Sequence, residues 1–115
     1  LLEQRSAMGN LYFALGPGLD AGRAAALLAE LGLGDVGDKP VRDYSGVMKR
    51  RLALVRALLA PADALALDEP FAGLDADTRL RCLEAVGRLA AGKLLVLASH
   101  DPADAPALGA RVEAL

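Results

Sequence analysis

The sequence contains few of the residues that build disulfide scaffolds, zinc sites or aromatic binding cages. It has one cysteine, Cys82, one histidine, His100, and no tryptophan. A single cysteine excludes an internal disulfide and any cluster of thiolate ligands, which suits a reducing compartment. A lone histidine cannot form a zinc site by itself.

Positive charge is not in excess either. The formal net charge is -2, whereas proteins that bind the phosphate backbone of a nucleic acid carry a broad basic surface. The basic run at residues 49–51 falls within an expected helix, where such runs are usually a solvated face. We therefore expect no nucleic-acid partner.

Long apolar runs are absent as well, because Asp, Arg or Gly interrupts every stretch rich in leucine and alanine. A membrane-spanning helix needs about 20 apolar residues, so none is expected here. The chain begins at Leu1, and no charged-then-apolar leader follows. We expect part of a longer protein, located in the cytoplasm.

What the sequence does contain is 54% hydrophobic residues, enough for a buried core. In residues 1–60, leucine- and alanine-rich segments follow Ser6 and Asp20, which stand at capping positions. Glycine and proline separate these segments. The expected helices run to Leu15, from Ala21 to Leu31 and from Gly46 to Ala60, the last with an apolar stripe of Val47, Met48, Leu52, Val55, Leu58 and Leu59.

Residues 61–115 change pattern to short apolar strands, 64–67 and 94–98, around a helix at 77–91. Such strands are typical of a parallel sheet covered on both faces. The expected fold is therefore α/β, with a helical domain at 1–60 followed by an α/β portion at 61–115. The residues of the helix expected to face inward are Leu80, Leu83, Val86, Leu89 and Ala90.

Polar residues follow both expected strands, at the sheet edge where open α/β proteins bind ligands. Asp68 could hold Mg²⁺, mainly through water, and Glu69 could orient or deprotonate an attacking water. Pro70 favours an extended Glu69. His100, after the second strand, could contact a terminal phosphate. The plain alternatives are an acidic turn and a solvated loop histidine.

Ser45 and Gly46 precede the third helix, whose first amides form a candidate anion site. The alternative is that Ser45 is only a helix cap. Residues 87–93 have the spacing of a phosphate-binding loop, but Leu94 stands where Ser or Thr is needed and a strand follows instead of a helix. We therefore expect the chain to lack that loop.

These motifs together resemble the ATP-binding cassette (ABC) family over essentially the whole chain. Residues 44–51 are similar to its signature, 65–70 to its Walker B strand, 71–75 to its D-loop and 99–101 to its switch-histidine loop. The resemblance implies part of a P-loop NTPase (RecA-like) core preceded by a helical subdomain. Tyr44 and Val47 replace the usual Leu and the second signature Gly, and a side chain at 47 narrows the approach to phosphate.

The resemblance also implies roles for individual residues. Asp68 assists Mg²⁺, Glu69 is the general base and His100 senses the γ-phosphate. Asp75 couples the two sites of a dimer. Ser45 and Gly46 contact the nucleotide of the partner.

The function implied is ATP binding and hydrolysis that energises transport, with ATP and Mg²⁺ as cofactors. The implied partners are a second nucleotide-binding subunit, as a homo- or heterodimer, and a membrane permease. Through the permease, the protein would sit peripherally on the inner face of the cell membrane. The alternatives are a soluble, non-transport ABC ATPase and a catalytically silent fragment or interaction module.

Overall fold

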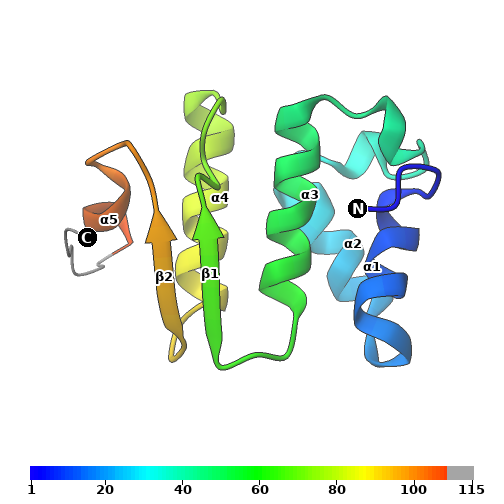
Figure 1. The fold of residues 1–115 in the computed structure, drawn as a ribbon, viewed down its shortest axis with the longest axis horizontal. Helices are drawn as coiled ribbons and strands as arrows, with labels where there is room; N and C mark the ends of the chain where they lie inside the picture. Colours follow the sequence, from blue (N-terminus) through cyan, green and yellow to red (C-terminus); the bar gives the residue numbers. More distant parts are fainter. Residues whose placement is uncertain (109–115) are drawn as a thin grey trace. The chain divides into compact units, whose positions relative to one another are not determined.

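The computed structural model describes residues 1–108 and divides the chain into two compact units, Leu1–Ala60 and Pro61–Leu115 (Figure 1). The first unit consists of helices joined by short turns. The second contains a two-stranded parallel sheet and its connecting helix. None of the helices within the described residues is long and apolar enough to cross a membrane.

Three α-helices build the first unit: α1 (Ala7–Leu15), α2 (Ala21–Glu30) and α3 (Gly46–Leu59). Each begins after a side-chain cap, as the sequence predicted. Ser6 accepts from the Gly9 amide, Asp20 from the Arg23 amide and Ser45 from the Met48 amide. These bonds satisfy amides that lack partners within the helix. Single 3-10 turns occur at Gly16–Gly18, Gly34–Val36 and Val41–Asp43.

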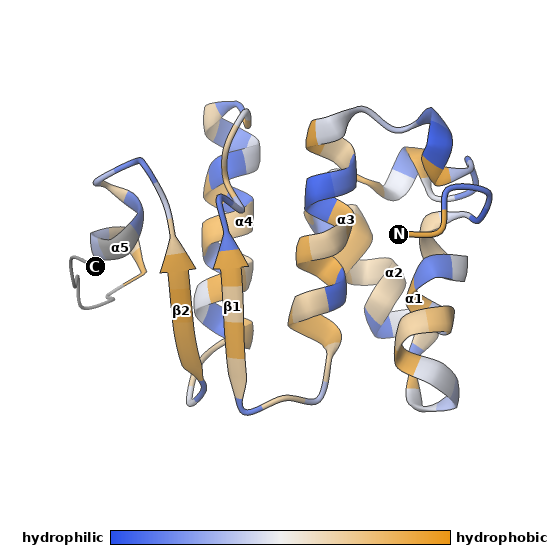
Figure 2. Ribbon diagram, viewed as in Figure 1, coloured by the Kyte–Doolittle hydropathy of each residue, from blue (hydrophilic) through white to orange (hydrophobic). Residues whose placement is uncertain are grey.

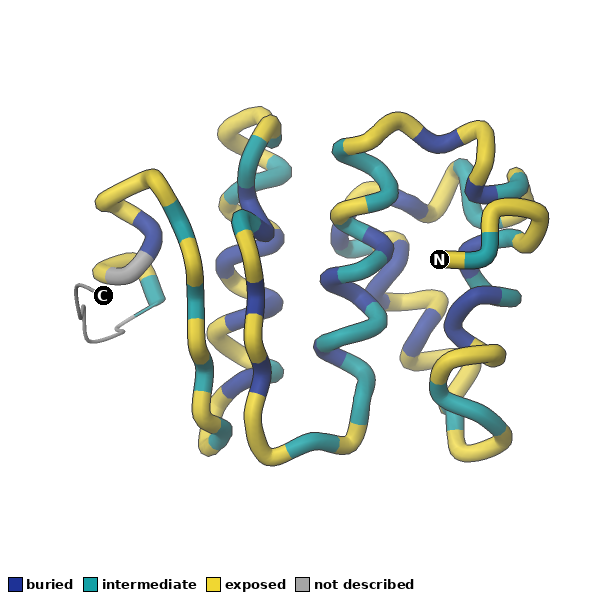
Figure 3. The backbone as a smooth tube through the Cα atoms, viewed as in Figure 1, coloured by how far each residue is buried: buried dark blue, intermediate teal, exposed yellow. Residues whose placement is uncertain are grey.

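The core of this unit forms where the three helices contact one another (Figure 3). α3 buries Leu52, Leu54, Val55 and Leu58. The predicted stripe missed Leu54 and included Val47, Met48 and Leu59, which are half-buried. The error arises because the helix is packed on more than one side, so its buried face is wider than a single stripe.

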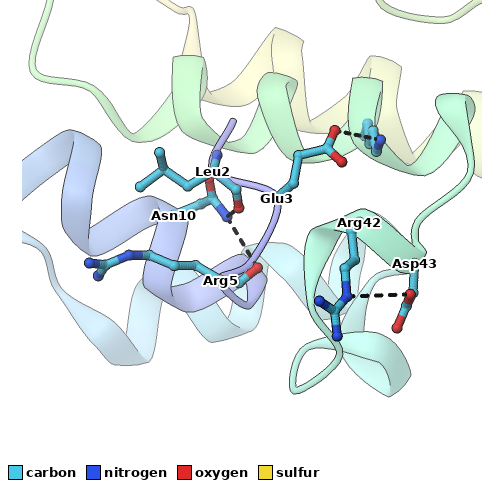
Figure 4. Close-up of polar contacts among 7 residues, drawn as sticks. Leu2, Glu3, Arg5, Asn10, Arg42 and Asp43 are labelled. Atoms are coloured by element: carbon cyan, nitrogen blue, oxygen red, sulfur yellow. Dashed lines mark hydrogen bonds and ion pairs between the residues drawn. The ribbon is translucent and has the colours of Figure 1, made fainter.

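Asn10 ties the N-terminal segment to α1 (Figure 4). Its side chain is buried, with only 4% of the residue exposed. The Asn10 Oδ1 accepts from the Leu2 amide at 2.6 Å, and Nδ2 donates to the carbonyls of Leu2 and Ser6 at 2.9 and 3.0 Å. Its third contact, to the Arg5 carbonyl, is longer at 3.4 Å. One buried side-chain amide therefore has both its oxygen and its nitrogen bonded to backbone groups.

The same N-terminal segment also contacts residues that are distant in sequence. The amides of Val41 and Arg42 donate to the carbonyls of Arg5 and Glu3. Lys49 on α3 donates to Glu3 at 2.8 Å, and this hydrogen bond lowers the pKa of the Glu3 carboxyl (Figure 4). The segment before α1 is thus bound to the turn that precedes the signature-like residues and to the helix that carries most of them.

Gly32 ends α2 in a conformation that requires glycine. Its φ is 81°, and a Cβ placed there would lie 2.8 Å from Nη1 of Arg51, which donates to the Leu31 carbonyl at 3.0 Å. We expect Gly32→Ala to destabilise the first unit by about 1–2 kcal/mol, through left-handed strain and displacement of Arg51. Chemical denaturation measures this difference.

Gly22→Ala is the matched control, because Gly22 lies within the same helix and its added Cβ meets only the Asp20 carboxylate at 3.5 Å. This variant should be neutral or more stable by up to about 1 kcal/mol, since alanine favours helix. Equal stabilities of the two variants would contradict the role assigned to the Gly32 conformation.

The second unit is a β-α-β arrangement of β1 (Ala64–Asp68), α4 (Ala76–Leu89) and β2 (Leu94–Ala98), followed by the short α5 (Asp104–Ala107). The two strands are parallel, and Asp68 pairs with Ala98. Gly87 lies inside α4 and Leu94 begins β2, so residues 87–93 join a helix to a strand. This order is the reverse of a phosphate-binding loop, as the sequence indicated.

Two expectations about burial in this unit were wrong. Leu80 was expected to face inward, yet 56% of the residue is exposed. The sheet was expected to be covered on both faces, but Leu94 and Val96 are 66% and 58% exposed in a strand that is apolar along its length (Figures 2 and 3). The described residues supply one covering layer, whose buried positions on α4 are Cys82, Leu83, Ala85 and Val86. Cys82 is buried and forms no disulfide.

Candidate functional site

The turn after β1 carries the first two predicted site residues. Asp68 is the last residue of the strand and is exposed, while the Glu69 amide donates to the Ala98 carbonyl of β2 at 2.7 Å. The expected extended conformation of Glu69 was wrong, because its φ is 46°. It is the only non-glycine residue with positive φ among residues 1–108. This bond to β2 and the tight turn outweigh the preference imposed by Pro70.

Glu69 and His100 come together, although 31 positions separate them in the sequence. The Oε1 of Glu69 lies 3.0 Å from Nδ1 of His100, the distance of an ion pair when the imidazole is protonated. Oε1 is a buried atom and has no hydrogen-bond donor in the described part of the chain. The His100 side chain is 87% exposed and that of Glu69 is 32% exposed. The Glu69 side chain is thus partly exposed, but its Oε1 atom is buried.

A cavity of about 410 Å³ opens beside this pair. Its walls come from the turn after β1, the first turn of α4 and the segment after β2. Gly73 in this lining has a φ of 77°, and the neighbouring Phe71 is buried. The residues around the cavity are Glu69, Phe71, Ala72, Gly73, Leu74, Arg79, His100, Asp101 and Asp104.

Asp75 has a structural role of its own. It is the N-cap of α4, and its Oδ1 accepts from the Thr78 amide at 2.7 Å. The residue is exposed. The capping bond accounts for an acidic residue here without excluding the coupling role predicted from the resemblance.

Ser45 and Gly46 belong to the first unit, whereas the other predicted site residues belong to the second. Ser45 caps α3, which is the role that the simpler interpretation of the sequence assigned to it. A Cβ added to Gly46 would have no neighbouring atom within 4 Å. Val47 is half-buried in the first turn of the helix. Tyr44 is buried, its hydroxyl donates to the Val36 carbonyl at 2.7 Å, and burial raises the pKa of its phenol. This hydrogen bond explains how tyrosine fits where the signature usually has leucine.

Sequence reasoning missed two charged residues beside the cavity, Arg79 on α4 and Asp104 on α5. The Arg79 guanidinium donates to the Asp104 carboxylate, which also accepts from the Ser99 hydroxyl. Only 4% of the Asp104 side chain is exposed. A buried charge of this kind is rare without a partner of opposite charge. The sequence carries no local signal of this pair, because its arginine and its aspartate are 25 positions apart.

These elements define the class of the protein. Parallel strands, a crossover helix and acidic and histidine side chains beyond the strand ends form part of an α/β core of the P-loop NTPase type. The family model described as ABC transporter matches residues 2–72. The chain belongs to this family.

Individual relatives agree with this assignment. The chain is 39% identical to the aliphatic sulfonates import ATP-binding protein SsuB 1 of Rhizobium johnstonii, over 97% of the chain and 43% of the relative. It is 36% identical to the taurine import ATP-binding protein TauB of Ruegeria pomeroyi, over 97% and 44% respectively. The chain therefore spans less than half the length of these two relatives.

Among solved structures, the chain is similar to that of an archaeal ribosome recycling factor, aABCE1, in complex with the ribosomal stalk protein aP1. The TM-score is 0.73 at 30% identity, and the match covers 86% of this chain and 19% of the other. The fold is thus shared by family members whose names describe different cellular roles.

Proposed function

We propose that this chain forms the catalytic half-site of an ATP-hydrolysing ABC subunit. The observation that carries the proposal is the placement of Glu69 and His100 3.0 Å apart, next to Asp68 at the carboxyl edge of the sheet. In the proposal, Glu69 accepts a proton from the attacking water, since its side chain lines the cavity at this edge. His100 contacts the terminal phosphate of the nucleotide.

Asp68 is the residue proposed to hold Mg²⁺. No group of three or more His, Cys, Asp or Glu side chains suited to a metal occurs in the described part of the chain. A single exposed carboxylate nevertheless fits Mg²⁺, which keeps several waters and binds phosphate oxygens instead of an all-protein cage. The metal supplies positive charge that stabilises the phosphoryl group during transfer.

A second subunit completes the proposed site. The helix that begins at Gly46 has amides at its N-terminus that suit an anionic phosphate, and Ser45 and Gly46 are exposed. In the proposal they contact the nucleotide of the partner, and Asp75 couples the two sites. The sequence contains no complete phosphate-binding loop, and in the proposal another part of the whole subunit supplies it.

The proposed role of hydrolysis is to drive import through a membrane permease. The two relatives described above are named as import ATP-binding proteins, which favours this role over one on ribosomes. The subunit would then lie on the cytoplasmic face of the membrane, held by the permease. The similarity to aABCE1 keeps a non-transport ATPase as the second candidate.

Magnesium-dependent hydrolysis of ATP by the whole subunit tests this proposal. Phosphate release should require Mg²⁺ and should stop on chelation, because the divalent ion neutralises developing charge. Asp68→Asn should weaken activation by Mg²⁺, whereas Asp63→Asn, at an exposed position just before β1, should not. A subunit that binds ATP but releases no phosphate with or without the metal would contradict the proposal.

A further inference from the structure

The segment that carries His100 is bound on both sides of the histidine. Ser99 donates to Asp104, and the Asp101 amide donates back to the Ser99 hydroxyl at 3.1 Å. The Asp101 carboxylate accepts from the Ala103 amide at 2.9 Å. His100 lies between these anchored residues, with most of its own side chain in solvent.

Arg79 connects this segment to α4. Its Nη2 donates to Asp104 and lies 3.5 Å from the Asp101 carboxylate. Arg79 is itself 27% exposed at the side chain, while Asp104 is almost completely buried. A buried carboxylate is costly without a partner, so Asp104 is stable there only with the guanidinium and hydroxyl that it contacts.

We propose that Arg79 and Asp104 are positioning residues that hold the 99–101 segment so that His100 stays beside Glu69. Both residues line the cavity, and the role proposed for them is exerted through the segment that carries His100. Arg79 is fixed to the rigid α4, whereas His100 follows the end of β2, and the Arg79–Asp104 pair joins the two. The inference deepens the proposed hydrolytic function and rests on it.

Arginine suits this task because its planar guanidinium can contact two carboxylates at once. Here one nitrogen, Nη2, donates to Asp104 and lies 3.5 Å from the Asp101 carboxylate, on either side of the same short turn. Arg79 therefore connects both ends of the segment that carries His100, which limits the movement of a histidine proposed to act beside a reacting phosphate.

Kinetics of Arg79→Gln in the whole subunit form the first arm of the test. We expect kcat to fall about 10- to 100-fold while KM for ATP changes far less, because a displaced group impairs the chemical step more than binding. Arg79→Lys should recover part of the lost kcat. The matched control is Arg81→Gln, two residues along the same helix and exposed, which should behave as wild type.

Hydrogen exchange over residues 99–104 forms the second arm and needs no turnover. Exchange of the Asp101 and Ala103 amides should be about 10-fold faster in Arg79→Gln than in Arg81→Gln, because the bonds that protect them loosen. Ser99→Ala removes only one hydroxyl. It should accelerate the same amides, and it remains available if Arg79→Gln does not fold.

The two arms separate failure of this inference from failure of the proposed function. If the wild-type subunit hydrolyses ATP but neither kcat nor exchange responds to Arg79→Gln or Ser99→Ala, the positioning role is overturned and the function stands. If exchange responds and the wild type hydrolyses nothing, the segment is anchored as described but the function is overturned. An equal rise in KM and fall in kcat would indicate a nucleotide-binding role for Arg79 instead.

Discussion

Replacing Glu69 with glutamine should reduce ATP turnover by the whole subunit about 100-fold or more while leaving ATP binding intact. The amide keeps the size of the carboxylate but cannot accept a proton from water. Glu69 has a strained backbone, with φ at 46°, and an Oε1 without a hydrogen-bond donor among residues 1–108. Backbone strain of this kind persists only where the surrounding structure enforces it, and it clusters at functional sites.

Phosphate release under saturating Mg·ATP measures the loss, and titration with a fluorescent ATP analogue measures the binding. Glu84→Gln is the matched control, because Glu84 is exposed on α4 and lies outside the lining of the cavity. Its turnover should equal that of the wild type. Retained hydrolysis in Glu69→Gln would remove this residue from the catalytic role.

Asn10→Asp should destabilise the first unit by about 3 kcal/mol, the largest effect on stability that we expect. Aspartate can still accept from the Leu2 amide, but it loses the Nδ2 donor that serves the Leu2 and Ser6 carbonyls. A buried carboxylate would then face those carbonyl oxygens. Chemical denaturation followed by circular dichroism measures the change.

Gln4→Glu is the control for Asn10→Asp, because it introduces the same charge by the same chemical change at an exposed position. It should alter stability by less than about 0.5 kcal/mol. The deficit of Asn10→Asp should also shrink as the pH is lowered, since protonation of the buried carboxyl restores a donor. A deficit that does not change with pH would point to lost packing instead.

Local signals explain why the elements were predicted well. Ser6, Asp20 and Ser45 cap helices because short polar side chains at these positions bond to nearby amides, which depends on neighbours in sequence alone. The strands at 64–68 and 94–98 were visible as apolar runs that end in polar residues. Leu80 was misplaced because helical spacing shows a periodic pattern but does not show how wide the buried face is.

The sequence by itself determined the order of helices and strands, the ABC-type motifs and the placement of Asp68, Glu69 and His100 at strand ends. Each of these follows from local spacing and from parallel strands sharing one edge. Only the tertiary structure decided that Glu69 adopts a left-handed conformation and that Arg79 and Asp104 anchor the histidine segment. These features depend on contacts between residues distant in the chain, whose geometry arises only when the backbone has folded.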